Sequence, residues 1–577
     1  MSLAPTGAGP GPDAARLARR VVERLTHRGP DGLGVVGDAL SAVAMCRLRV
    51  RSRPADRVPF PDGPDGTCHA YNGEVYAVGA GAGAGAADAT VPRGGLDEAQ
   101  AVHDHGCHAL DGMYALVRRT RGGAVEITRD PLGIKPLYLR RHRDGVAVAS
   151  EIPALLDVFG PARIRAAAVA QFLLLGRVVD GGSWYEDIEP VPPGTRLLLK
   201  EGRTETVWAP PPPSAVAGSP GWPATPDGIR AAVSRAVDRV LVSDRPLGLA
   251  LSGGLDSTVV ALELARRGID DLATVSVVPE GNGDGVREVA DLSLPGTAWR
   301  GWRHRWTGFG PADLLAGVAD AAAVLGEPTA MTSVPMYAAL ARLAREEGIV
   351  VLLLGEGADE VFGGYRSYLA LQRLGSAEEF YVAPRRVELV RALLGEEAVA
   401  GALDALRAAL PVADGRPTAE VVRDFEYEHS LEPLLRRADH LLMAEGVEGR
   451  TPFLHGGLPA LGRAYPMAGL LRGGQTKVPL REAYARELPH WRTEVKKPFR
   501  APVDDWLIAG HRSAATGRLA DRDELFTAVG LRSEALRGLL RQVTDGDTGA
   551  TGLVFPLLSL GAWLEQAGAE ALPGGGS

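Results

Sequence analysis

The feature that most constrains this chain of 577 residues is the stretch LALSGGLDSTVVAL, residues 249–262. An apolar run enters a short bend that holds two glycines and an acid, and a second apolar run leaves it. The first run is short and unbroken, as in a buried strand, whereas the second has the spacing of a helix. The pattern therefore predicts a strand that ends at Leu251, a tight loop, and a helix that begins near Asp256.

The predicted loop has the composition of a phosphate-binding site. Amides in the first turn of a helix point outward with a positive dipole, and Gly253 and Gly254 would let the backbone approach an anion closely. Ser252 and Ser257 add hydroxyl donors. A carboxylate beside phosphates is repulsive unless a cation lies between them, so Asp256 is interpreted as a ligand of Mg²⁺. The alternative is a plain turn from strand to helix.

A second loop of this kind follows another apolar run and reads GEGADEVFGGY, residues 355–365. Glu356, Asp359 and Glu360 lie near its start. In a parallel sheet both loops would face one crevice, so Asp256 and Asp359 are expected to share a metal ion and to leave Glu356 as a base. The alternative is that some of these acids cap the following helix.

The alternation of helical periods with buried strands around these loops predicts an α/β domain with a doubly wound parallel sheet. Its last ~200 residues are expected to be mainly helical. Short strand-like segments earlier in the chain predict an antiparallel α+β domain. The proline-rich segment 208–226 is expected to be a linker, so we place the domains at 1–207 and 227–570, with a disordered tail at 571–577.

Composition limits the class of protein. The net charge of −8 at pH 7 argues against a general binder of nucleic acids or membrane surfaces, which would carry a basic excess. No apolar run predicts a transmembrane helix, and the N-terminus lacks the apolar core of a secretory signal. Cys46, Cys68 and Cys107 give no disulfide framework and suit a reducing cytosol. We expect a cytoplasmic protein whose partners are small-molecule substrates, and a homodimer is left open.

With further motifs along most of the chain, these loops resemble those of the class B asparagine synthetases. LSGGLDST is similar to the pyrophosphatase loop of that family, and GEGADEVFGGY is similar to its second ATP-site loop. The matches to the family's glutaminase domain are, in order, LTHRGPDGLG, YNGEVY, LDGMYAL, RDPLGIKPLYL, ASEIPALL and VPPGTRLLL. The matches to its synthetase domain are DHLLMAEGVEGRTPFL, TKVPLREAYARELP and KKPFRAPVDDWL.

The resemblance implies an N-terminal-nucleophile-like domain, built as an antiparallel sandwich, followed by an ATP pyrophosphatase (PP-loop) domain. It implies ATP and Mg²⁺ as cofactors: a substrate carboxylate attacks the α-phosphate, pyrophosphate leaves, and an amine attacks the acyl-adenylate to release AMP. Lys496 would neutralise charge on the phosphates, although it could instead be a surface residue, and Glu356 would accept the proton of the amine. The residues implied to hold ATP and its pyrophosphate are Leu251, Ser252, Gly253, Gly254, Asp256, Ser257, Gly355 and Lys496.

The N-terminal domain departs from the family at its nucleophile. The family's glutaminase uses a cysteine at position 2, where this chain has Ser2, followed by a run of prolines and glycines that cannot pair in a sheet. Cys46 cannot serve, because exposing it as the first residue would remove the HRGPDG motif. Two alternatives remain: Ser2 is the nucleophile, or the start codon is misassigned. We interpret the matching glutamine-site residues as vestigial; they are Arg47, Asn72, Gly73 and Glu74.

Three other positions bear on the chemistry. The segment HDHGCH (103–108) has ligand side chains but no standard zinc spacing, so a polar loop is expected. His455 stands where the family usually has aspartate, and Met331 where some members carry arginine. Both are expected to lie near the acyl substrate, and both weaken the case for aspartate.

The sequence therefore predicts an ATP-dependent, AMP-forming carbon–nitrogen ligase with an inactive glutaminase. Its nitrogen would come from free ammonia or from a substrate amine. We favour the amine, as in the related β-lactam synthetases and lasso-peptide cyclases, and hence a role in natural-product metabolism. The alternatives are an asparagine synthetase that uses aspartate with ammonia or glutamine, and a non-catalytic ATP-binding scaffold.

Overall fold

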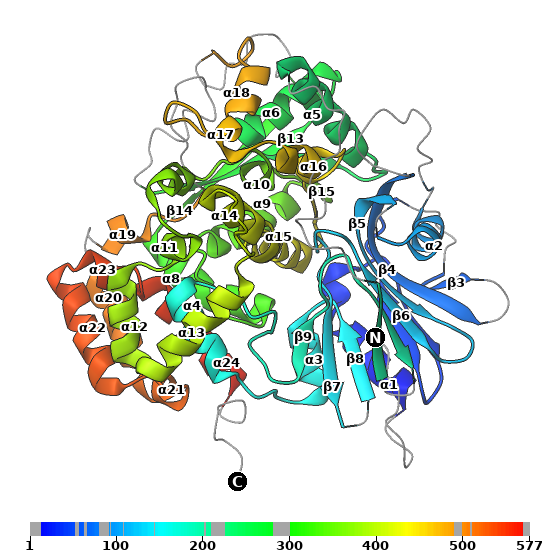
Figure 1. The fold of residues 1–577 in the computed structure, drawn as a ribbon. Helices are drawn as coiled ribbons and strands as arrows, with labels where there is room; N and C mark the ends of the chain where they lie inside the picture. The colour runs from blue at the N-terminus through cyan, green and yellow to red at the C-terminus, as the bar shows by residue number, and fades with distance from the viewer. Residues whose placement is uncertain are drawn as a thin grey trace.

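A computed structural model gives the fold, in which an N-terminal region ends at Trp208 and a C-terminal region begins at Thr225. In Figure 1 the strands of the N-terminal region lie at the right in blue and cyan, while its helix α4 lies left of centre; the parallel sheet lies in the upper part, and the last helices lie at the lower left. The residues that the structure describes are 13–51, 57–62, 66–79, 92, 94–107, 109–143, 145–200, 203–208, 225–280, 301–489, 499–507 and 511–568.

Antiparallel sheets dominate the N-terminal region. Its strands are β1 (Leu33–Gly37), β2 (Ala42–Cys46), β3 (Phe60–Asp62), β4 (Thr67–Val78), β5 (Leu110–Arg119), β6 (Val125–Arg129), β7 (Tyr138–His142), β8 (Gly145–Ala149), β9 (Ile188–Pro190), β10 (Arg196–Lys200) and β11 (Arg203–Trp208). The largest sheet has the order β11-β10-β6-β5-β4-β3, and β8-β7-β9 and β1-β2 form two smaller sheets. The helices are α1 (Ala14–Glu23), η1 (Thr26–Arg28), α2 (Gly95–His105), α3 (Ile152–Phe159) and α4 (Ala166–Leu175). The predicted antiparallel α+β architecture is confirmed.

A five-stranded parallel sheet organises the C-terminal region, as predicted. Its strands are β12 (Leu247–Ala250), β13 (Ala273–Pro279), β14 (Arg303–Phe309), β15 (Val351–Leu353) and β16 (Glu448–Arg450). Their order is β14-β13-β12-β15-β16, so the direction of winding reverses between β12 and β15. Ligands bind at such a reversal, outside the carboxyl ends of the strands.

Helices cover both faces of this sheet. They include α5 (Pro226–Val240), α6 (Leu255–Arg266), α8 (Pro311–Leu325), α9 (Val334–Glu346) and α10 (Ala358–Phe362). Leu353 of β15 belongs to a core cluster with residues of α5 and α6, whereas its neighbour Leu352 belongs to a cluster with residues of α8 and α9. Burial on both faces explains why the strands read as continuous apolar runs.

The rest of the C-terminal region is mainly helical, as expected. Its elements are η4 (Arg366–Arg373), α11 (Ala377–Tyr381), α12 (Pro384–Leu394), α13 (Glu396–Ala409), α14 (Thr418–His429), α15 (Leu431–Ala444), η5 (Pro452–Leu454), α16 (Leu458–Ala464), α17 (Met467–Leu470), α18 (Val478–Ala483), α19 (Val503–Trp506), α20 (Arg512–Ala520), α21 (Asp523–Ala528), α22 (Ser533–Asp545), α23 (Thr548–Thr551) and α24 (Val554–Ala567). Most of the predicted linker and the whole predicted tail lie outside the described residues.

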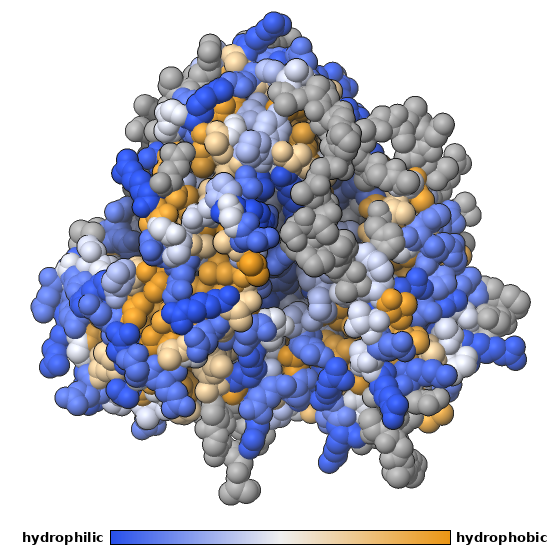
Figure 2. Space-filling view, viewed as in Figure 1, coloured by the Kyte–Doolittle hydropathy of each residue, from blue (hydrophilic) through white to orange (hydrophobic). Residues whose placement is uncertain are grey.

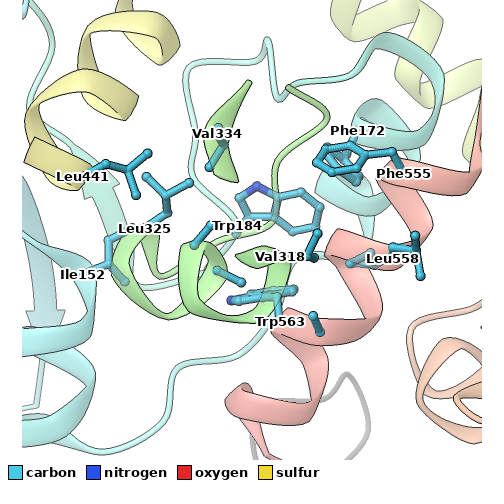
Figure 3. Packing of buried hydrophobic residues seen from close by; sticks show 14 of the residues in the cluster. Ile152, Phe172, Trp184, Val318, Leu325, Val334, Leu441, Phe555, Leu558 and Trp563 are labelled. Carbon is cyan, nitrogen blue, oxygen red and sulfur yellow. The ribbon is translucent and has the colours of Figure 1, made fainter. Parts of the chain in front are cut away.

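One hydrophobic core joins the two regions. The ring of Trp184 lies edge-on to Phe172 of α4, at a centroid distance of 5.1 Å, and to Trp563 of α24, at 5.0 Å. Trp563 Nε1 donates hydrogen bonds to Tyr185 Oη at 3.2 Å and to the carbonyl of Gly326 at 3.1 Å. Figure 3 shows both indoles among side chains of α4, α8 and α24. Because the rings come from both regions, packing fixes how the regions sit against each other.

Buried ion pairs cross the same boundary. Arg28 donates to Glu151 at 2.8 Å and to Asp439 of α15 at 2.6 Å, and Lys135 Nζ lies 3.2 Å from Asp439. Burial alone would raise the pKa of Asp439, but Arg28 and Lys135 lower it to about 2. Removing one partner would therefore leave a buried charge uncompensated.

In the view of Figure 2, hydrophobic and hydrophilic residues are mixed over most of the face, and hydrophobic residues gather around α4, α11 and α12. Within the described parts of the chain, every helix is too short or too polar to cross a membrane.

Candidate active site

The first predicted loop joins β12 to α6. The strand ends at Ala250 and the helix begins at Leu255, each one residue before the predicted position. Gly253 has φ +73°, a left-handed conformation that favours glycine. Ser257 Oγ lies 3.1 Å from Ser252 Oγ and accepts a hydrogen bond from the Ser252 amide at 3.2 Å, so the two hydroxyls close the base of the loop.

The second predicted loop lies directly against the first. It follows β15, and α10 begins within it at Ala358. A Cβ atom placed on Gly355 would lie 3.0 Å from Cβ of Asp256, so this glycine permits the close approach of the two loops. The parallel sheet thus brings together two segments that lie about a hundred residues apart.

Both loops line one cavity of about 490 Å³ at the carboxyl ends of β12 and β15. Lys496, predicted to bind phosphate, lies outside the described residues. The other predicted ATP-site, metal and base residues all line this cavity: Leu251, Ser252, Gly253, Gly254, Asp256, Ser257, Gly355, Glu356 and Asp359.

A buried lysine lies between the two predicted metal ligands. Lys477 Nζ is 2.5 Å from Asp256 Oδ1 and 2.7 Å from Asp359 Oδ1, and its side chain is only 3% exposed. Two carboxylates from different loops therefore point at one position, which a cation fills. Within the described residues there is no group of three or more acidic, histidine or cysteine side chains placed to hold a metal ion.

The predicted base, Glu356, is held by two other side chains of the cavity wall. Arg437 of α15 donates to Glu356 Oε1 at 2.6 Å, and the hydroxyl of Tyr337 donates to the same oxygen. The guanidinium of Arg437 also lies over the Tyr337 ring, 4.1 Å from its centroid. Burial and the Glu356 carboxylate raise the pKa of Tyr337 well above its usual value, so Tyr337 remains a donor.

Glu360, the third acid of the second loop, has a different environment. Its side chain is buried, and Tyr365 Oη donates to it at 2.5 Å. Burial and the nearby Asp359 carboxylate raise the pKa of Glu360 to about 7. Glu360 is therefore part of the supporting wall of the cavity; it lies inside α10, whose N-terminus has no side-chain cap.

A second cavity adjoins the first. Its volume is about 870 Å³, and Ser252, Ser276, Val277, Phe499 and Arg500 line both cavities. Phe499 packs edge-on against Tyr337 at a centroid distance of 5.6 Å, so it stands beside the partners of Glu356. The further walls combine apolar side chains with charged ones; the apolar ones include Leu174, Leu175, Ala330, Met336, Trp506 and Phe555, and the charged ones are Glu280, Arg386, Asp504 and Asp505.

The predicted glutamine-site residues lie together in the N-terminal region. Arg47, Asn72, Gly73 and Glu74 all line a cavity of about 130 Å³. Arg51 Nη1 lies in the same cavity, 3.3 Å from Glu74 Oε2 and 3.1 Å from Glu98 Oε1. The acids of this cavity are therefore already paired with a cation.

Burial controls the chemistry of this smaller cavity. It raises the pKa of Glu74 to about 7, although Arg450 and Arg51 act in the opposite direction, and it also raises the pKa of Glu98. The Cys46 thiol donates to the carbonyl of Leu25 at 3.0 Å, and burial raises its pKa to about 11. Cys46 is thus a thiol at neutral pH, without the thiolate character of a nucleophile.

Comparison with known families now identifies the chain. Residues 228–565, more than half of its length, match the family model described as asparagine synthase. The chain belongs to the asparagine synthase family. Residues 96–208 match the model of a glutamine amidotransferase domain. Members of the asparagine synthase family are ATP-dependent carbon–nitrogen ligases, and this chain is an enzyme of that class.

Similar proteins carry the same family name. A Mycobacterium tuberculosis protein, provisionally named a glutamine-hydrolysing asparagine synthetase, is 27% identical over 582 residues, which cover 88% of this chain and 87% of that protein. Asparagine synthetase 3 of Arabidopsis thaliana is 30% identical over 387 residues, covering 63% and 60%. The enzyme of Sandersonia aurantiaca is 29% identical over 371 residues, covering 60% and 63%.

Of the two expectations about family departures, the one for His455 was wrong, and the one for Met331 stays a prediction. His455 does not line either cavity of the synthase domain: it is buried against the N-terminal region, with Nδ1 2.9 Å from Asp111 and its ring 4.7 Å from that of Tyr76. It is an interface residue, because the turn after η5 faces β4 and β5. Met331 itself lines neither cavity, but its neighbours Ala330 and Thr332 line the second one.

The segment 103–108 is also not the expected loop. Its first residues complete α2, which ends at His105, and His103 Nδ1 lies 3.1 Å from Glu126. Cys107 is buried. His108 lies outside the described residues. The apolar face of α2 packs on β4, so tertiary packing extends a helix into a segment whose glycine and histidines favour a loop.

Sequence reasoning missed three residues of the synthase cavity: Tyr337, Arg437 and Lys477. Arg437 lies just before the motif DHLLMAEGVEGRTPFL, and Lys477 follows directly after the threonine of TKVPLREAYARELP. No local pattern connects them with the loops, because Lys477 is 221 positions from Asp256 and Arg437 is 81 positions from Glu356.

Proposed function

We propose that this protein activates a carboxylic acid with ATP and joins it to a substrate amine in natural-product metabolism, and that its N-terminal region does not hydrolyse glutamine. The observation that carries this proposal is the convergence of Asp256 and Asp359 on one cation position beside the phosphate loop, with Glu356 in the same cavity. We also propose that the protein is cytoplasmic and that two copies of the chain form a homodimer.

The residues of the loop suit Mg²⁺. Two carboxylate oxygens from separate loops converge on one buried cation, and carboxylates with phosphate oxygens are the ligands that Mg²⁺ prefers. When bound, Mg²⁺ would neutralise charge on the phosphates of ATP. Asp256 and Asp359 would hold it, while Ser252, Ser257 and the amides of the loop would orient the pyrophosphate. Lys496 remains our proposed second cation.

Glu356 is proposed to take the proton of the attacking amine. Tyr337 and Arg437 hold one of its oxygens, Oε1, so they fix the orientation of the carboxylate. A base must lie within hydrogen-bonding reach of the proton it removes, so a fixed carboxylate favours a fixed position of the amine.

The second cavity supports a substrate larger than aspartate. It adjoins the ATP crevice beside Tyr337, and its volume of about 870 Å³ gives room for the body of a larger acid. Its walls combine apolar side chains with charged ones. The N-terminal pocket supports an inactive glutaminase, because Ser2 replaces cysteine and Arg51 already pairs with Glu74 and Glu98.

The second candidate is an asparagine synthetase that uses ammonia or glutamine with aspartate. The names of the relatives and the loop GEGADEVFGGY favour it. A non-catalytic scaffold is the third candidate, but a scaffold has no physical need for converging acids in a phosphate crevice.

Mass spectrometry of reactions that contain ATP, Mg²⁺ and aspartate, with ¹⁵N-ammonium or amide-¹⁵N-glutamine, separates the first two candidates. We expect no labelled asparagine from either nitrogen source, and ATP–pyrophosphate exchange with larger carboxylic acids. Asparagine labelled from ammonium alone would establish the ammonia-dependent synthetase. Asparagine labelled from glutamine would contradict the inactive glutaminase. ATP binding without exchange for any acid would favour the scaffold.

A further inference from the structure

Lys477 has a left-handed backbone conformation, and its side chain is buried between two carboxylates. It is one of two non-glycine residues with positive φ in the described chain, at φ +55° immediately before α18. Its carbonyl accepts a hydrogen bond from the amide of Arg481 at 3.0 Å, so the first turn of α18 fixes the strained residue. A non-glycine residue in this region costs of order 1 kcal/mol, and the surrounding contacts must offset that cost.

The second loop is shaped around the lysine. A Cβ atom on Gly364 would lie 1.8 Å from Asp359 Oδ1 and 2.1 Å from Lys477 Cε. Only a glycine at this position therefore lets the loop close over the ion pair. The contact explains the second glycine of the GGY sequence, which the ATP-site motif alone does not explain.

Charge decides how many cations this position holds. One ammonium between two carboxylates leaves the group with one net negative charge. Burial disfavours the charged ammonium, and its short contacts with Asp256 and Asp359 offset that cost. A divalent cation at the same oxygens would lie beside a charged ammonium, and that repulsion is strong in a buried site.

We propose that Lys477 is an exchangeable counter-ion: it holds Asp256 and Asp359 together when no nucleotide is bound, and it pairs with phosphate oxygens when a divalent cation takes the two carboxylates. That the anion is the polyphosphate of ATP rests on the proposed function. The site then binds the cation and the polyphosphate together, because the displaced ammonium needs a new anionic partner. Lys477 also becomes a positive charge beside the leaving pyrophosphate.

The test uses two probes, Mn²⁺ alone and pyrophosphate in the presence of Mg²⁺. In Lys477→Met we expect Mn²⁺ alone to bind about tenfold more tightly than in wild type, because no cation competes for the carboxylates. We expect Mg²⁺-pyrophosphate to bind about tenfold more weakly, because its ammonium partner is lost. Electron paramagnetic resonance measures free Mn²⁺, and calorimetry measures pyrophosphate binding.

Lys477→Arg is the matched control, since it keeps the charge, and its Mn²⁺ affinity should stay near that of wild type. Asp256→Asn should abolish the Mn²⁺ signal, which assigns the signal to this site. Unchanged or weaker Mn²⁺ binding in Lys477→Met would overturn the proposal. If that variant does not fold, Lys477→Gln takes its place. These readings need no acid substrate, so failure to find one would count against the proposed function and leave the counter-ion result intact.

Discussion

The acids of the N-terminal cavity and the acids of the synthase crevice are held by different kinds of cation. In the N-terminal cavity, Glu74 is paired with Arg51 and with Arg450, which also donates to Glu448 and to the carbonyls of Val240 and Val242. In the synthase crevice, the single ammonium of Lys477 joins Asp256 and Asp359.

The two cations differ in how many hydrogen bonds and ion pairs each would lose if its side chain moved. Arginine binds several acceptors at once in a rigid fork, whereas lysine is a point charge on a flexible stem. The Arg450 guanidinium ties the acids of the small cavity into the interface between the regions, so they serve packing. Lys477 can leave its position, and the crevice around it has about 490 Å³ against about 130 Å³ in the N-terminal cavity.

The largest expected contrast comes from neutralising one acid in each cavity. Asp256→Asn should lower ATP-dependent pyrophosphate release by about 100- to 1000-fold, because a charge that organises the phosphates is lost. Glu74→Gln, the matched variant of the other cavity, should leave the rate unchanged. A coupled pyrophosphate assay measures both. Equal losses in the two variants would show that the cavities are not functionally separate.

A second contrast lies within the crevice itself. Glu356→Gln should lower amide formation by about 100-fold, because the proposed base for the amine proton is lost. ATP–pyrophosphate exchange, which reports only the activation step, should persist. The two rates are measured on one preparation, with Tyr337→Phe as a variant that keeps the carboxylate. Loss of both rates together in Glu356→Gln would assign Glu356 to the phosphate site instead.

The raised pKa of Glu74 should make the stability of the folded chain depend on pH. The pKa of Glu74 rises from its ordinary 4.5 to about 7 in the folded chain. A carboxyl with a raised folded pKa stabilises the fold below its unfolded pKa and loses that contribution as the pH rises through its folded pKa. Relative to wild type, Glu74→Gln should therefore gain on the order of 2 kcal/mol between pH 4.5 and 7.5. Urea unfolding at the two pH values measures the difference, and parallel pH profiles would contradict the shift.

The smallest expected effect concerns Ser2. Wild type and Ser2→Ala should release the same background level of glutamate from glutamine, because Ser2 stands where the family has its cysteine nucleophile. Their ligase rates with an amine should also be equal. Glutamate release by wild type that disappears in Ser2→Ala would make Ser2 a working nucleophile.

Local patterns predicted much of the fold. The strand before SGGLD and the helix after it lie within one residue of the predicted bounds, because apolar periodicity and paired glycines act over neighbouring residues. The second loop was placed at the same edge of the sheet for the same reason. The segment 103–108 was mispredicted because packing of α2 against β4, which is not local, decides it.

The sequence by itself determined that two acidic, glycine-rich loops end parallel strands, and it placed Ser2 where the family has its cysteine. Only the tertiary structure decided what stands beside each acid: Lys477 between Asp256 and Asp359, Arg437 on Glu356, and Arg51 on Glu74. Most of these partners lie far apart along the chain. The strength of each pair depends on distance and burial, which exist only once the chain has folded.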